Sequence, residues 1–124
     1  MLNDGVFQMI FDEISLYLPD RWDRTVIYLE YGESSYSFSF YVKSTGHYTK
    51  CFDLPEIDED QLLRSFKKID KVVSLERRKE SGNQWSNMTM IVDNKGNMHT
   101  DFDFTDMTES AYQYSKAWKK KYLV

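Results

Sequence analysis

The chain has few cysteines and prolines, and it has no long hydrophobic run. Its 124 residues include one cysteine, Cys51, and two prolines. One cysteine excludes an intramolecular disulfide and a cysteine-rich zinc site, and it fits a reducing compartment. No stretch approaches the roughly 18 apolar residues of a transmembrane helix. The N-terminal residues Met-Leu-Asn-Asp-Gly also lack the basic and apolar regions of a signal peptide. We therefore expect a cytoplasmic protein.

An excess of positive charge is also missing. The chain has 20 acidic residues against 16 lysines and arginines, for a net charge of −4. Phosphate backbones and anionic membrane surfaces attract basic proteins, so we expect neither direct nucleic-acid binding nor membrane binding. A mildly acidic domain is better matched to a basic protein partner.

Sequence motifs of catalysis are absent as well. The chain has no Gly-x-Ser-x-Gly nucleophile motif, no glycine-rich phosphate loop and no His-Glu-x-x-His zinc motif. Cys51 and His47 would lie four residues apart on one strand, beyond hydrogen-bond reach, so Cys51 is expected to be a small core residue. We therefore expect no catalytic residue, no cofactor and no metal, and we do not expect an enzyme.

What the chain does contain is typical of one globular domain over residues 1–124. Apolar residues make up 41% and charged residues 29%, a balance that separates it from disordered chains. Three segments have the hydrophobic period of an amphipathic helix. The first covers about residues 4–18. The second begins at Asp58 with Gln61, and the third at Asp106 with Glu109, and both pairs match a capping box.

Five segments have the alternation or the β-branched and aromatic content of strands. They cover residues 25–31, 36–43, 47–52, 85–92 and 98–104. Short turns join most of them, so the sheet should be mainly antiparallel. The order α-β-β-β-α-β-β-α predicts an α+β fold with a five-stranded sheet flanked by three helices. We expect the helices on one face, in two layers.

One strand places a histidine and two carboxylates on the same face. His99, Asp101 and Asp103 are two residues apart, and they could bind a divalent metal or share a proton. Strand alternation alone also produces this pattern, with Met98 and Phe104 among the core residues of the opposite face. We favour a solvated face, because a strand separates such side chains by about 7 Å at each step. A small metal-dependent enzyme or a regulatory subunit using this face is the alternative.

Acidic residues gather at two places. The second cluster contains Asp101, Asp103, Asp106 and Glu109, and helix capping explains part of it. The first cluster precedes the second helix and contains Asp53, Glu56, Asp58, Glu59 and Asp60. Five acids exceed what one helix cap requires, so docking of a basic partner and a purely structural role are about equally favoured.

Several motifs together resemble the YezG-like immunity (antitoxin) family. They are Pro19-Asp20-Arg21-Trp22 after the first helix, Trp85-Ser86-Asn87-Met88, the Gly96 turn, Phe102-Asp103-Phe104-Thr105-Asp106 and the Trp/Lys/Tyr-rich last helix. The resemblance covers nearly the whole chain. Trp22, Trp85, Phe102, Asp103, Phe104 and Asp106 are its motif residues. Their expected role is structural, with Asp106 as a cap and Asp103 bonded to nearby backbone.

The resemblance implies a non-catalytic protein that binds and neutralises a cognate toxin in the cytoplasm of the producing cell. In that family the partner is the C-terminal domain of a polymorphic toxin, often a nuclease, which is delivered between competing bacteria by contact-dependent inhibition. The residues expected at the toxin interface are those of the first acidic cluster, from Asp53 to Asp60. We expect a monomer.

Overall fold

The computed structural model describes residues 2–80 and 84–124, and describes only the backbone of residues 108–110. The helices are α1 (Asp4–Ser15), α2 (Glu59–Arg78) and α3 (Met107–Tyr122). The strands are β1 (Arg24–Tyr31), β2 (Tyr36–Ser44), β3 (His47–Lys50), β4 (Asn87–Asp93) and β5 (Met98–Asp103), and a short 3-10 helix, η1, covers Cys51–Asp53. The predicted order of helices and strands is confirmed.

The strands form one five-stranded sheet in the order β3-β2-β1-β4-β5. Every neighbouring pair is antiparallel, which confirms the predicted sheet. β1 lies at the centre, where Ile27 pairs with Phe40 of β2 and with Met90 of β4. The chain reaches β4 only after α2, so the two halves of the sequence meet where β1 pairs with β4.

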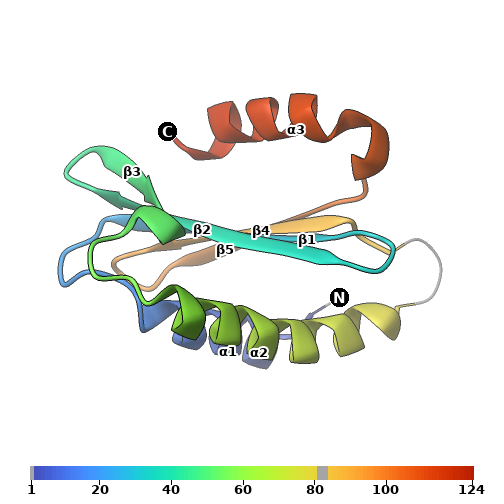
Figure 1. The fold of residues 1–124 in the computed structure, drawn as a ribbon, viewed down its shortest axis with the longest axis horizontal. Coiled ribbons are helices and arrows are strands. Elements are labelled where there is room, and N and C mark those ends of the chain that lie inside the picture. Colours follow the sequence, from blue (N-terminus) through green and yellow to red (C-terminus); the bar gives the residue numbers. More distant parts are fainter. Residues whose placement is uncertain (1, 81–83) are drawn as a thin grey trace.

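The helices cover both faces of the sheet, which corrects the expectation of two layers. α1 and α2 lie on one face and α3 lies on the other (Figure 1). The main core joins α1, α2 and one sheet face through residues such as Ile10, Ile27 and Ile69. A smaller cluster joins Trp118 and Tyr122 of α3 to the opposite face. Hydrophobic periodicity identifies the buried face of a helix, but it does not identify the sheet face on which the helix packs.

The edge strand β5 also differs from the prediction. Met98 and Phe104 were expected in the core, but they are 38% and 45% exposed. Phe102, which lies between Met98 and Phe104 on the same face of β5, is covered, because it packs against Phe7 of α1 with ring centroids 6.5 Å apart. The opposite row is half-buried at Asp101 and Asp103, so it is not a fully solvated face.

Local sequence signals were more reliable. Asp58 Oδ1 accepts a hydrogen bond from the Gln61 backbone N–H at 3.1 Å, which confirms the cap of α2. Gly96 lies in the predicted turn between β4 and β5, and its φ of +89° is in the left-handed region that glycine adopts without steric cost. The third strand is shorter than predicted, because the chain turns into η1 at Cys51, whose side chain is buried. The predicted capping box of Asp106 with Glu109 includes Glu109, whose side chain lies outside the described residues.

Candidate functional site

The strand face of His99, Asp101 and Asp103 only partly comes together. His99 Nε2 lies 2.9 Å from Asp101 Oδ1, which is closer than strand geometry alone predicts. Asp103 instead accepts hydrogen bonds from Thr105. Among the side chains that the structure describes, which exclude those of residues 1, 81–83 and 108–110, no group of three or more His, Cys, Asp or Glu is placed to hold a metal ion. The three residues therefore form a surface pair and a separate structural carboxylate.

Asp103 stabilises the corner between β5 and α3. Its Oδ1 accepts hydrogen bonds from the Thr105 backbone N–H at 2.8 Å and from the Thr105 hydroxyl at 2.6 Å. Its Oδ2 lies 3.1 Å from the Tyr114 hydroxyl, which is also 2.9 Å from Asn87 Oδ1. Burial acts to raise the pKa of Asp103, but these hydrogen bonds outweigh it and leave the pKa lowered. The carboxylate is therefore occupied within the fold.

The two tryptophans of the sequence motifs contribute to packing. Trp22 is half-buried against Phe11, with ring centroids 6.1 Å apart. Trp85 is fully buried, and its ring centroid lies 5.4 Å from that of Phe102. Arg77 donates a hydrogen bond from Nε to the Trp85 carbonyl at 2.7 Å and also stacks over the indole. These side chains join α1, α2 and the sheet and present little surface to a partner.

The first acidic cluster lies on the surface at the entrance to α2. Asp53 ends η1, Glu56 lies in the following loop, and Asp58, Glu59 and Asp60 cap and begin α2. All five side chains are exposed. Only Asp58 has a hydrogen bond or ion pair to another described residue, through its cap of α2. The other four carboxylates are free to meet a partner.

A groove of about 430 Å³ lies beside this cluster. One wall is the connector after α1, with Leu16, Pro19 and Asp20, and the other is the loop that contains Glu56 and Asp58. The rest of its lining is Tyr17, Leu18, Leu54, Pro55, Ile57 and Gln61. Leu16 is 63% exposed. The groove therefore combines exposed apolar surface with three carboxylates at its edge. We call it the acid-edged groove.

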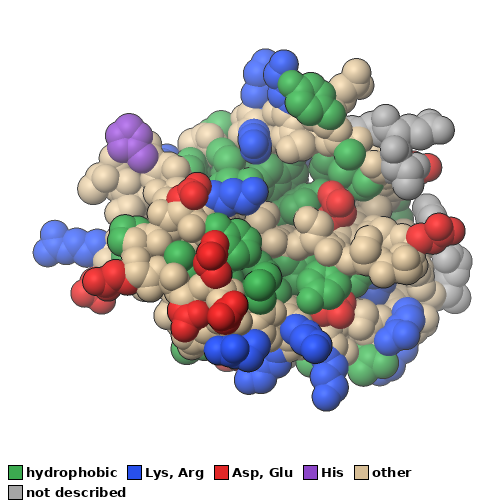
Figure 2. All heavy atoms as spheres, viewed as in Figure 1, with side chains coloured by type: hydrophobic (Ala, Val, Ile, Leu, Met, Phe, Trp, Pro, Cys, Tyr) green, Lys and Arg blue, Asp and Glu red, His purple; other side chains and the backbone are tan. Residues whose placement is uncertain are grey.

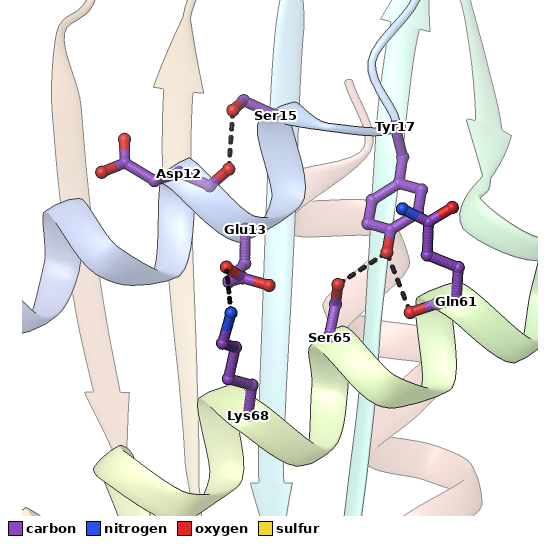
Figure 3. A network of polar contacts seen from close by, with 7 residues as sticks. All are labelled: Asp12, Glu13, Ser15, Tyr17, Gln61, Ser65 and Lys68. Atoms are coloured by element: carbon purple, nitrogen blue, oxygen red, sulfur yellow. Dashed lines mark hydrogen bonds and ion pairs between the residues drawn. The ribbon is translucent and has the colours of Figure 1, made fainter.

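A hydrogen-bond network holds the two walls of the acid-edged groove together. The Tyr17 hydroxyl donates to the Gln61 carbonyl at 2.9 Å and lies 2.6 Å from Ser65 Oγ, as Figure 3 shows. Nearby, Lys68 pairs with Glu13 at 3.5 Å between α2 and α1. Tyr17 thus attaches the connector after α1 to the first turns of α2. This attachment fixes the position of one wall of the groove relative to α2.

The charges on this side of the molecule are segregated. Acidic side chains gather over the loop before α2, and lysines and arginines gather along the outer side of α2 (Figure 2). The basic side chains that follow the cluster on α2 are Arg64, Lys67, Lys68 and Lys71, and all four are exposed. A partner at the groove would therefore meet a negative surface, although the chain as a whole is only mildly acidic.

Sequence reasoning found one wall of the groove and missed the other. The charge run from Asp53 to Asp60 was visible, but nothing in the sequence joined it to Leu16 or Asp20 about 40 residues earlier. An exposed leucine at the end of an amphipathic helix was the available signal, and Pro19 marked the chain reversal beside it.

Among the described residues, no helix has both the length and the apolar composition needed to cross a membrane.

Comparisons with known proteins identify relatives along almost the whole chain. The model of the family described as "Immunity protein YezG-like" matches residues 3–124. The immunity protein YezG of Bacillus subtilis is 22% identical over 129 aligned positions, which cover 95% of this chain and 85% of that protein. The immunity protein YezG of Bacillus spizizenii is 23% identical over 113 positions, which cover 85% of this chain and 70% of that protein. Membership of this family supports an immunity role for the chain, suggests that the chain acts as a non-enzymatic inhibitor, and implies that its partner is a toxin. The chain belongs to the YezG-like immunity protein family.

Proposed function

We propose that this protein neutralises a basic toxin domain by binding it at the acid-edged groove and the adjoining acidic cluster. The partner would be the C-terminal nuclease domain of a polymorphic toxin, bound by a monomer in the cytoplasm of the producing cell. The observation that carries this proposal is a run of exposed carboxylates, four of them without partners among the described residues, beside a groove that also exposes the apolar side chain of Leu16. Family membership supports the immunity role, and the charge supports the choice of surface.

The proposed block is direct occlusion. A nuclease presents a basic cleft to the phosphates of its substrate, and carboxylates at matching positions can occupy the same cleft. Glu56 and Asp58 edge the groove, while Glu59 and Asp60 extend the negative surface onto the first turn of α2. Exposed apolar surface at Leu16 supplies an anchor that charge alone lacks, because exposed ion pairs contribute little net affinity.

The partner can be identified by purifying this protein from its native cells and analysing bound proteins by mass spectrometry. Recovery of a toxin C-terminal domain is expected. Binding of an inactive form of that domain is then measured by calorimetry and stopped-flow at low salt. The triple variant Glu56→Gln, Glu59→Gln, Asp60→Asn should weaken binding by about 0.6–3 kcal/mol, since each exposed ion pair contributes about 0.2–1 kcal/mol. Slower association should account for part of the loss.

A matched control removes three acids from elsewhere on the surface. Asp12→Asn, Asp23→Asn and Glu33→Gln change the net charge equally, and all three side chains are exposed outside the acid-edged groove. Asp58 is left unchanged in both variants because it caps α2. Equal loss of affinity in the two triple variants would refute the proposed interface. Recovery of no toxin domain from the native cells would contradict the proposed partner.

A further inference from the structure

A second hollow lies between α3 and the sheet, over β1 and β2. Its volume is about 270 Å³, and it shares no lining residue with the acid-edged groove. Pockets for drug-sized ligands occupy about 300–1,000 Å³, so this space suits a single side chain. We call it the α3 cleft.

Aromatic rings form much of the wall of the α3 cleft. They belong to Tyr28, Tyr41, Tyr114 and Trp118. The Trp118 ring lies 5.0 Å from the Tyr28 ring and 5.6 Å from the Tyr41 ring. Trp118 is held in place, because its Nε1 donates a hydrogen bond to Thr89 Oγ1 at 2.8 Å. Such rings present negative π faces, which attract cations within about 6 Å.

A carboxylate lies in the same wall. Glu30 is half-buried, and its Oε1 accepts a hydrogen bond from the Tyr28 hydroxyl at 2.7 Å. Its other oxygen has no hydrogen bond to a described residue. Asp103 Oδ2 lies 3.1 Å from the hydroxyl of Tyr114 in the cleft wall, so the charge of Asp103 adds to the negative potential there. Burial and this charge raise the pKa of Tyr114 to about 12. A carboxylate with an open acceptor position favours a cationic donor.

Lys50 also lines the cleft, but strand register places it at the far end from Glu30. Glu30 pairs with Ser37 on β2, whereas Lys50 pairs with Tyr41. Ser37 and Tyr41 are four residues apart, which is about 13 Å along a strand. The end of the cleft near Glu30 therefore keeps its negative charge. Ser37 lines this end, because it pairs with Glu30, and Ser39 lines the middle of the cleft.

From this arrangement we propose that the α3 cleft binds an arginine side chain of a partner protein. A guanidinium is planar and weakly hydrated, and it can stack on aromatic rings while donating to a carboxylate and to hydroxyls. An anion would meet the charge of Glu30, and an apolar side chain would bury that charge without a partner. The proposal stands on the cleft alone and is independent of the toxin surface proposed above.

The test is a nuclear magnetic resonance titration of the whole protein with N-acetyl-arginine amide. The signal to follow is the indole N–H of Trp118, together with the backbone amides of Ser37 and Ser39. A saturable shift is expected, with a dissociation constant on the order of millimolar. N-acetyl-citrulline amide, which has a similar shape without charge, should bind at least about tenfold more weakly, since a charged hydrogen bond contributes about 1.5–3 kcal/mol.

Variants locate the binding site. Glu30→Gln keeps an oxygen that can accept from Tyr28, and it should weaken arginine binding about tenfold. Glu33→Gln removes the same charge from the β1–β2 turn outside the cleft and should leave binding unchanged. Lys50→Met should leave it unchanged or strengthen it. Equal binding of arginine and citrulline, no saturable shift in the millimolar range, or equal effects of Glu30→Gln and Glu33→Gln would overturn the proposal.

Discussion

Replacing Trp118 by phenylalanine should lower the free energy of unfolding by about 2–4 kcal/mol. The indole Nε1 donates to Thr89 Oγ1 at 2.8 Å, and the Thr89 side chain is only 1% exposed. Removing the donor leaves a buried hydroxyl without its partner, which costs about 1–3 kcal/mol. The smaller ring also loses contact with Tyr28 and Tyr41, and the resulting cavity should cost about 1 kcal/mol more. This loss is large beside a typical stability of about 5–15 kcal/mol.

A double-mutant cycle with Thr89→Val separates the hydrogen bond from the cavity. Urea unfolding, followed by circular dichroism, gives the free energy of unfolding of the natural protein, both single variants and the double variant. If the hydrogen bond attaches α3 to the sheet, the double variant should lose at least about 1 kcal/mol less than the sum of the single losses. Additive losses, within about 0.3–0.5 kcal/mol, would refute this account of how α3 is attached.

Two further predictions concern ionisable groups. The hydrogen bond from the Tyr122 hydroxyl to Asp101 Oδ2 and the contact with His99 lower the pKa of Asp101. These contacts therefore stabilise the folded protein fully above the usual aspartate pKa near 3.9. The stabilisation is lost as the pH falls through the lowered pKa of Asp101. In urea unfolding, the stability difference between the natural protein and Tyr122→Phe should therefore shrink below about pH 4, and a constant difference from pH 2 to pH 7 would contradict this. The Cys51 side chain is fully buried, and burial raises the pKa of its thiol. A disulfide reagent at pH 8 should therefore react with Cys51 only as the protein unfolds, so the reaction rate in urea should follow the rate of unfolding. Rapid reaction of the folded protein would contradict the position of Cys51.

The order of the secondary structure elements could be predicted because each depends on signals within a few residues. Asp58 with Gln61 specifies the start of α2, and Gly96 specifies the β4–β5 turn. Strict alternation along residues 36–43 identifies β2, which lies next to the central strand of the sheet. In each case the hydrogen bond, the backbone angle or the burial pattern is local, so sequence spacing is enough to predict it.

The layer formed by α3 could not be predicted in the same way. Tyr114, Trp118 and Tyr122 share one helix face, as their spacing predicts, but their partners Thr89 and Asp101 lie on strands that also have a second face. Which face receives α3 depends on the path of the whole chain. The same reason explains why Asp101 was expected to be solvated, since its cover comes from a helix 21 residues away.

Some acidic residues make hydrogen bonds that stabilise the fold, and others are exposed and available to a partner. Asp58 caps α2, Asp101 accepts from Tyr122 and Asp103 accepts from Thr105, so replacing these acids removes bonds of the folded state. The acids of the first cluster without such bonds among the described residues are Asp53, Glu56, Glu59 and Asp60. Exposed substitutions of this kind usually change stability by less than about 0.5 kcal/mol. The proposed toxin surface can therefore change its charge pattern to suit a partner without altering the sheet or the helices that position it.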